Sequence, residues 1–328
     1  MIEKSDLEFN LPAEQIAQSP IRPRDAARLL VMERATGALS ELRFSELPEA
    51  LAPEDLVVVN DTRVLPARLR GHKASGGRAE ALLIERRPDG SWLALVRAGG
   101  RLRRGLALRF GELGATVEDV GVDGTCRLRL EKEELLEQFG EAPLPPYIRR
   151  DEPLASDLGD YQSIFARVSG AVAAPTASLH FTPGLAERLR IARVTLHVGP
   201  GTFRPVRCAR LEEHRMDAER FEVPAKTAEA IAATRTSGGR VIAVGTTVVR
   251  ALESSRGEPA RGRTELFILP GHEFRSIDSL ITNFHLPGST LLALVMAFGG
   301  IEATKRAYTH AIENGFRFYS YGDAMWIR

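Results

Sequence analysis

Hydrophobic and polar positions follow two different patterns along the chain, and the change of pattern divides the chain into two parts. Residues 1–63 and 145–328 contain continuous apolar runs, such as 55–60 and 240–244, between amphipathic stretches. Runs of this kind are typical of strands buried on both faces of a sheet. Alternating strands and helices predict a largely parallel sheet covered by helices, which is a three-layer α/β/α sandwich.

Residues 64–144 follow the second pattern, in which short segments alternate between apolar and polar positions. Glycine-rich turns separate the segments, which cover residues 79–85, 92–97, 106–110, 115–120 and 125–130. Short, evenly spaced strands with no helix between them indicate a small antiparallel barrel. We therefore predict an inserted β-barrel domain at 64–144 within a discontinuous α/β catalytic domain formed by 1–63 and 145–328.

Local signals in the larger part predict several further elements. They include a hairpin over 27–33 and 38–44, a helix over 160–168, a strand over 265–269, and two strands joined by a turn over 316–328. Thr182 precedes a proline, and Ser289 precedes an apolar run, so both are predicted to cap helices.

Small residues, threonines and histidines crowd together between residues 170 and 205. The sequence there is G-A-V-A-A-P-T-A-S-L-H-F-T, followed after a spacer by V-T-L-H-V-G-P-G-T-F. Small side chains allow a backbone to approach a ligand or another segment closely. The stretch is therefore either a tightly packed corner that holds His180 and His197 in the core, or one wall of a site.

Polar groups follow four of the predicted strands at the point where each strand ends. These are N-D-T-R at 60–63, H-V-G-P-G-T at 197–202, G-T-T at 245–247 and N-F-H at 283–285. Each group alone could be an ordinary turn. Because the carboxyl ends of parallel strands meet at one edge of a sheet, their convergence predicts an active site there. Such groups suit orientation and proton transfer better than metal binding, and we predict no metal.

Composition narrows the class of protein. The 328 residues carry a net charge of +1, which excludes a histone-like binder but not a local basic face. Cys126 and Cys208 are too far apart for a metal motif, and the longest apolar run, 291–298, is too short to span a bilayer. No phosphate-binding or dinucleotide glycine motif is present. We therefore expect a cytoplasmic protein that does not associate with membranes.

Arginine is abundant in the predicted barrel. The cluster is either a solvated face or a surface that binds nucleic acid. We predict the second alternative, a face that binds nucleic acid. The basic residues concerned are Arg68, Arg70, Lys73, Arg101, Arg103 and Arg104.

Long motifs in the sequence resemble a known family. They are N-D-T-R-V-L-P-A-R-L at 60–69, G-A-V-A-A-P-T-A-S-L-H-F-T at 170–182, T-L-H-V-G-P-G-T-F-R-P-V at 195–206 and I-T-N-F-H-L-P-G-S-T-L-L at 281–292, with shorter matches at 143–148, 244–247 and 321–325. The chain is similar to the S-adenosylmethionine:tRNA ribosyltransferase-isomerases of queuosine biosynthesis. Against the family pattern, Ser178 replaces glycine, Pro200 replaces leucine and Asp217 replaces a histidine.

The resemblance implies an α/β fold with an inserted barrel and a transferase that works as a cytoplasmic monomer. The enzyme would transfer and isomerise the ribosyl moiety of S-adenosylmethionine onto 7-aminomethyl-7-deazaguanine at the wobble position of a tRNA. The products would be epoxyqueuosine-tRNA, adenine and methionine, with no cofactor, because S-adenosylmethionine is consumed. The alternatives are an enzyme that uses S-adenosylmethionine or a nucleoside on a small molecule, and a non-catalytic RNA-binding module.

The same resemblance assigns roles to the polar groups. His180, His197 and His285 are the candidate acids and bases because histidine titrates near neutral pH, and Asp61 is a candidate partner for the sulfonium or the amine. Each histidine could instead be a core residue bonded to backbone. The predicted substrate-binding residues are Asn60, Thr62, Arg63, Thr176, Phe181, Gly199, Gly201, Thr202, Thr246, Thr247, Arg250, Asn283 and Asp323.

Overall fold

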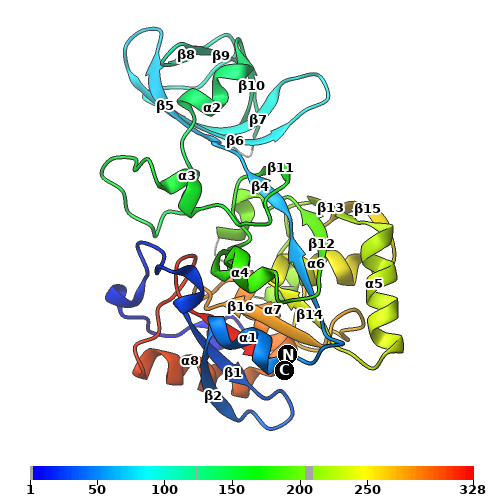
Figure 1. The fold of residues 1–328 in the computed structure, drawn as a ribbon. Coiled ribbons are helices and arrows are strands. Elements are labelled where there is room, and N and C mark those ends of the chain that lie inside the picture. The colour runs from blue at the N-terminus through cyan, green and yellow to red at the C-terminus, as the bar shows by residue number, and fades with distance from the viewer. Residues whose placement is uncertain (1–2, 123, 204–209) are drawn as a thin grey trace.

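The protein consists of a large sheet covered by helices and a separate small barrel, as Figure 1 shows. The structure is a computed structural model that describes residues 3–122, 124–203 and 210–328. Within these ranges, no helix is both long enough and apolar enough to cross a membrane.

Nine strands form the large sheet. In spatial order they are β15 (Ala260–Thr264), β13 (Glu219–Val223), β12 (Ile191–Leu196), β3 (Leu56–Asn60), β14 (Val241–Val244), β16 (Ser279–Asn283), β17 (Ala324–Ile327), β1 (Arg28–Met32) and β2 (Leu39–Arg43). The neighbours β12, β3, β14 and β16 are parallel, as are β1 and β17, whereas the remaining pairs are antiparallel. The predicted α/β class is confirmed, and the sheet is mixed, with its parallel part at the centre.

Alternate residues of the central strands are buried in two different cores. Val58, Val241 and Ala243 pack beneath the long helices, while Val57 and Val59 pack on the opposite face. The long helices are α5 (Ala225–Thr236), α6 (Thr246–Ser255), α7 (Thr290–Gly299) and α8 (Ile301–Glu313). Short turns cover the other face, namely η4 (Phe44–Glu46), α1 (Leu47–Ala50), η6 (Thr176–His180) and α4 (Pro183–Ala186). The helical layers are therefore unequal in thickness.

Six strands close into an antiparallel barrel in the order β10-β7-β6-β5-β8-β9. They are β5 (Arg68–Lys73), β6 (Arg78–Arg86), β7 (Trp92–Ala98), β8 (Ala107–Phe110), β9 (Leu113–Val120) and β10 (Thr125–Leu130), followed by α2 (Leu136–Phe139). The barrel has a separate apolar core, which explains the change of pattern in the sequence. A parallel ribbon of β4 (Thr62–Val64) and β11 (Val168–Ala171) lies between the barrel and the sheet (Figure 1).

Three predicted elements are wrong. The helix over 160–168 is limited to α3 (Asp157–Asp160), because Arg167 and Val168 donate backbone hydrogen bonds to the Asp61 carbonyl on the way into β11. The strand expected over 265–269 is β15, one segment earlier. Of the two C-terminal strands only β17 exists, because Arg28 and Arg317 donate backbone hydrogen bonds to the Asp323 carboxyl group and hold the preceding segment as a loop.

Candidate active site

The four polar strand ends meet at one edge of the sheet, as their sequence pattern predicts. They follow β12, β3, β14 and β16, which are adjacent and parallel. Asn60 at the end of β3 joins three of them. Its amide nitrogen donates to the Leu196 carbonyl at 2.9 Å and to the Thr247 hydroxyl at 3.1 Å, and its amide oxygen accepts from the Leu196 amide at 3.0 Å. Asn60 therefore holds the ends of β12, β3 and β14 in place relative to one another.

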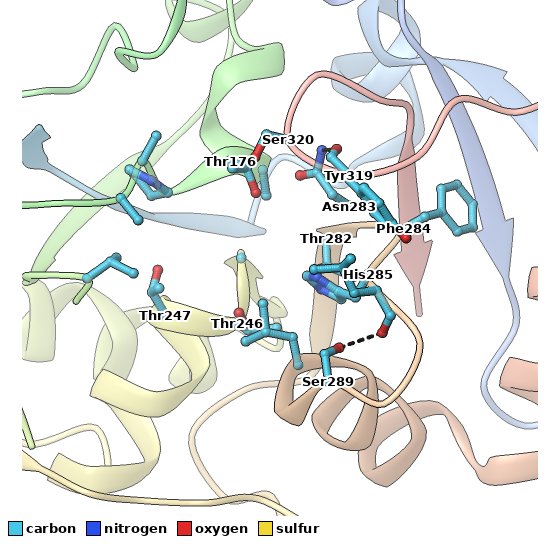
Figure 2. Close-up of a pocket in the computed structure, with 18 of the residues that line it drawn as sticks. Thr176, Thr246, Thr247, Thr282, Asn283, Phe284, His285, Ser289, Tyr319 and Ser320 are labelled. Carbon is cyan, nitrogen blue, oxygen red and sulfur yellow. Dashed lines mark hydrogen bonds between the residues drawn. The ribbon is translucent and has the colours of Figure 1, made fainter. Parts of the chain in front are cut away.

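A small cavity, which we call the inner cavity, lies between the ends of β14 and β16. Its volume is about 50 Å³. Figure 2 shows Thr246 and Thr247 on the helix α6, with Asn283 at the end of β16 and His285 on the segment that follows this strand. The lining also includes Tyr147, residues 173–177, Val198, Thr282, Phe284, Leu286, Ser289, Leu291, Tyr319 and Ser320.

Asn283 carries a polar atom that has no partner. Its amide nitrogen donates to the Tyr319 carbonyl at 3.0 Å and lies 3.3 Å from Nε2 of His180. Its Oδ1 is buried without a hydrogen bond, as is the hydroxyl of Ser178, among the described residues. Buried polar atoms in folded proteins are nearly always paired, so Oδ1 indicates a place for a ligand donor.

Two of the three predicted histidines are deeply buried. His285 lines the inner cavity, and its Nε2 lies 2.8 Å from the Thr282 hydroxyl. His180 stacks on Phe44 with ring centroids 4.9 Å apart and does not line the inner cavity. Burial lowers the pKa of each imidazole to about 3. Both rings are therefore neutral at pH 7, and the expectation that they titrate near working pH is wrong for this state.

His197 differs from the other two because it is only partly buried. Its Nδ1 lies 2.9 Å from the Thr62 hydroxyl, which in turn donates to the Val168 carbonyl at 3.4 Å. With the Thr62 hydroxyl donating to Val168, we assign the proton of the ring to Nδ1, which leaves the lone pair of Nε2 available. Burial and the nearby Arg220 lower the pKa of His197 to about 4. The imidazole is thus a neutral hydrogen-bond acceptor at pH 7.

Gly170 makes room for the His197 ring. Its φ is +149°, and a Cβ there would lie 2.8 Å from Nδ1 and Cε1 of His197. The two motifs also bond directly, since the Val172 and Ala173 amides donate to the Val198 carbonyl at 2.9 and 3.2 Å. The small residues near 170 therefore serve the packing of His197. Of the two roles that the sequence left open for this stretch, a packed corner and one wall of a site, packing is thus part of the answer.

A larger opening, which we call the cleft, lies between the barrel and the edge of the sheet. One compartment of about 210 Å³ contains His197, Gly199 and Val198, and Val198 also lines the inner cavity. A second compartment of about 940 Å³ adjoins it. Both compartments share Glu85, Leu93, Gly170, Arg220 and Arg263. The sequence offers no signal for Glu85, Arg220 or Arg263, which come from three separate strands.

Several predicted site residues besides Asn60, Thr62 and His180 line neither the inner cavity nor the cleft. Asp61 accepts hydrogen bonds from Arg167 at 2.8 Å and from the Thr195 hydroxyl at 2.6 Å, and Arg250 pairs with Glu219. Phe181 lies in the apolar core. The Asp323 carboxylate accepts the backbone hydrogen bonds described above. The Arg63 guanidinium lies 3.5 Å from Glu137 of α2. Arg250 supports the cleft indirectly. Its partner Glu219 also accepts a hydrogen bond at 2.8 Å from the amide of Gly199, which lines the cleft.

Three further predicted residues are Thr176, Gly201 and Thr202. Thr176 lines the inner cavity. At Gly201 a Cβ would come within 2.4 Å of the Asp217 carboxylate. Thr202 belongs to the turn η7 (Pro200–Phe203), and its side chain lies outside the described part of the chain. No group of three or more His, Cys, Asp or Glu side chains in the described ranges is arranged to hold a metal ion.

The predicted basic residues of the barrel form two groups, one with partners inside the protein and one without a carboxylate partner in the described chain. Arg68 pairs with Glu80 at 3.3 Å, Arg70 pairs with Glu141 at 3.3 Å, and the Lys73 ammonium donates to the Gly99 carbonyl at 2.6 Å. The side chains of residues 101, 103 and 104 are exposed, and no carboxylate in the described chain pairs with them. We call these three arginines the barrel cluster.

Fold and site together define a class of protein, namely an α/β sheet with a polar site at its carboxyl edge and a barrel that completes a cleft beside it. Residues 4–327 match the model of the queuosine biosynthesis protein family. The S-adenosylmethionine:tRNA ribosyltransferase-isomerase of Anaeromyxobacter sp. (strain K) is 52% identical over 98% of each chain. The enzyme of that name from Geobacter sulfurreducens is 47% identical over 98% of this chain and 99% of its own.

A solved structure is also similar. The crystal structure of the S-adenosylmethionine tRNA ribosyltransferase from Thermotoga maritima has a TM-score of 0.57 and 37% identity, and the match covers 98% of this chain and 100% of that one. The chain belongs to the queuosine biosynthesis protein family. The family and the class of enzyme that the motifs predict are confirmed.

Proposed function

We propose that this protein transfers and isomerises the ribosyl moiety of S-adenosylmethionine onto 7-aminomethyl-7-deazaguanine at the wobble position of a tRNA. The products are epoxyqueuosine-tRNA, adenine and methionine. The full-length match to enzymes named for this reaction supports the proposal. The observation that carries it is geometric: Val198 lines both the inner cavity and the cleft, and its chain neighbour His197 lines the cleft, so that two different substrates can approach one base.

We assign the donor to the inner cavity. Uncharged groups surround it, and Oδ1 of Asn283 is placed to accept from a hydroxyl or an amino group of the ligand. Ligand pockets usually enclose about 300–1,000 Å³. At about 50 Å³, the cavity holds only part of S-adenosylmethionine unless it widens. The remainder of the donor would extend past Val198 into the cleft, toward His197.

We assign His197 as the general base. The positive sulfur acidifies the neighbouring 5′ carbon of the donor, and Nε2 of His197 has the free lone pair that can accept the proton. Thr62 fixes the ring and its tautomer through Nδ1. A base that is neutral at pH 7 accepts a proton without first losing one, which suits the opening step. His180 and His285 position Asn283 and the segment after β16 and do not exchange protons.

The decisive experiment is incubation of the purified protein with S-adenosylmethionine and tRNA that bears 7-aminomethyl-7-deazaguanine. We expect release of adenine and methionine in a one-to-one ratio, and a nucleoside whose mass corresponds to epoxyqueuosine. Adenine release that does not require tRNA would instead indicate a small-molecule enzyme. Binding of tRNA with no turnover of the donor would indicate a non-catalytic RNA-binding protein.

We further propose that the protein acts as a cytoplasmic monomer without a cofactor, and that residues 64–144 form the inserted domain. One chain supplies both walls of the cleft, which supports the monomer. Sedimentation of the active enzyme at one chain per particle, with full activity in the presence of a chelator, is the expected result. Activity that appears only in a dimeric fraction would contradict it.

A further inference from the structure

Three charged side chains connect the barrel to the sheet across the cleft. Glu85 of β6 accepts from Arg263 at 2.9 and 3.3 Å and lies 3.4 Å from Nε of Arg220. Arg220 and Arg263 are register partners on the antiparallel strands β13 and β15. Like charges at directly opposed positions repel each other, so the pair requires an anion between them. Within this structure the Glu85 carboxylate is that anion.

The position of the arginine pair suits an anion that comes from solution. The side chains of Arg220 and Arg263 are 45% and 49% exposed, so they can exchange one partner for another. Although partial burial opposes it, Arg263 and Arg220 keep the pKa of Glu85 below its usual value, and the carboxylate stays ionised as a competitor at pH 7. Guanidinium groups bind phosphate oxygens in a fork, with two parallel hydrogen bonds.

Besides Glu85, Arg220 and Arg263, the charged residues that line the larger compartment are Arg86, Arg87, Glu133, Glu134 and Glu137. We call the apolar part of its lining the floor. Leu65, Leu93 and Leu136 line it, together with Trp92, whose buried Nε1 has no hydrogen-bond partner in the described chain. The compartment of about 940 Å³ has the size of a nucleotide site. The smaller compartment that joins it contains His197. An apolar floor, a paired guanidinium rim and an adjacent base are the parts needed to receive a nucleoside and its phosphate.

We propose that the cleft receives a single nucleotide of the tRNA, extruded from its stack, with its phosphate on Arg220 and Arg263 in place of the Glu85 carboxylate. The base then lies on the floor near Trp92 and points toward His197. Enzymes that modify a base in a polynucleotide generally extrude it from the stack. The inference rests on the proposed function, because it takes tRNA as the ligand.

The barrel cluster does not line the cleft. Residues 101, 103 and 104 belong to neither of its compartments. The cluster is followed by Gly105, whose amide donates to the Val117 carbonyl, and in the barrel register Val117 and Trp92 lie on either side of Leu128. We therefore expect the barrel cluster to contact the backbone of other nucleotides, whereas Arg220 and Arg263 hold the extruded one.

The test uses full-length tRNA and an anticodon stem–loop with 2-aminopurine at the wobble position, a probe that brightens when it leaves the stack. The Arg220→Gln, Arg263→Gln double variant should bind tRNA at least tenfold more weakly and should lose the fluorescence increase. The slope of log K against log salt should become shallower by about 1 to 2, at about 0.7 per lost contact. Affinity for S-adenosylmethionine should be unchanged.

Two further variants keep the result interpretable. Arg261→Gln is the matched control, since Arg261 lies on β15 together with Arg263, is exposed and does not line the cleft. It should retain both the tRNA affinity and the fluorescence change. Glu85→Gln retains both arginines and removes their competing anion, so it should bind tRNA several-fold more tightly. This variant tests the proposal even if the double variant does not fold.

Three results would overturn the proposal: an unchanged fluorescence increase in a folded double variant, an equal loss in Arg261→Gln, or weaker tRNA binding by Glu85→Gln. Failure of the proposed function has a different signature. The wild-type protein would then release no adenine in the presence of S-adenosylmethionine and substrate tRNA, while the arginine-dependent extrusion of 2-aminopurine would still be observed.

Discussion

The inner cavity and the cleft lie on opposite sides of Val198 and differ in nearly every physical property. The inner cavity is small and is lined by uncharged groups, among them His285, whose imidazole burial keeps neutral. The cleft is several times larger, is charged along its rim, and contains His197, which is partly exposed.

The difference shows how one sheet edge can serve two unlike ligands. A desolvated pocket with unpaired hydrogen-bonding groups selects a small ligand by shape and by donor and acceptor pattern. An open site with exchangeable ion pairs suits a polyanion, whose binding depends on salt. His197 lines the cleft, and its chain neighbour Val198 lines both the cleft and the inner cavity, which is where a reaction between the two ligands has to occur.

Replacement of His197 should cause the largest effect. His197→Ala should lower kcat by about 10²- to 10⁴-fold, because the reaction loses its base. Affinities for tRNA and S-adenosylmethionine should stay within a few-fold of wild type. Because the pKa of His197 is about 4, the wild-type kcat/KM should hold steady down to about pH 5. Adenine release is the measurement, and His310→Ala, on the exposed part of α8, is the control. A rate near that of wild type would remove His197 from the mechanism.

Lower pH should destabilise the protein through the two fully buried histidines. Their pKa is about 3 in the folded state and about 6.5 in the unfolded state. As the pH falls below 6.5, only the unfolded state gains protons, so stability decreases. At pH 5 each histidine should contribute about 2 kcal/mol to this loss.

Urea unfolding of His285→Gln at pH 7.5 and pH 5 tests this expectation. The variant should lose about 2 kcal/mol less than wild type between the two pH values. His72→Gln is the control, because His72 is an exposed residue of β5 in the barrel. If His285→Gln and wild type show parallel losses, His285 is protonated in the folded protein and the contrast between the two regions is weaker.

Asn283→Ala should separate the inner cavity from the cleft. The variant loses the unpaired Oδ1, and S-adenosylmethionine should bind about tenfold to a hundredfold more weakly, the effect of one buried hydrogen-bonding group. Binding of tRNA should change less than twofold. Calorimetric titration measures the first quantity and anisotropy the second, with Asn314→Ala as the exposed control. Equal losses for both ligands would show that the two regions act as one.

The smallest effect should come from the barrel cluster. Replacing Arg101, Arg103 and Arg104 with glutamine should weaken tRNA binding up to about tenfold and make the salt slope shallower by about 2. The 2-aminopurine signal at saturating protein should persist, because the cleft is intact. Loss of that signal would place the extruded nucleotide at the barrel cluster, and unchanged affinity would exclude the cluster from the RNA surface.

Much of the fold was accessible from local patterns. Continuous apolar runs identified β3 and β14, and alternation identified five of the six barrel strands. Thr182 and Ser289 cap their helices through hydrogen bonds from Leu185 and Leu292, as predicted. Such features depend on neighbours a few residues away. The errors at 160–168 and 316–328 arose where distant partners, Asp61 and Arg28, determine the conformation.

The family, the two-part fold and the convergence of four polar strand ends can all be inferred from the sequence, because periodicity and motifs are properties of neighbouring residues. How each polar side chain is used depends on the tertiary structure. It joins Asp61 to Arg167, moves the pKa of three histidines well below neutrality, and brings Glu85 to Arg220 and Arg263. Burial and charge pairing depend on residues far apart in the chain, and no local pattern encodes them.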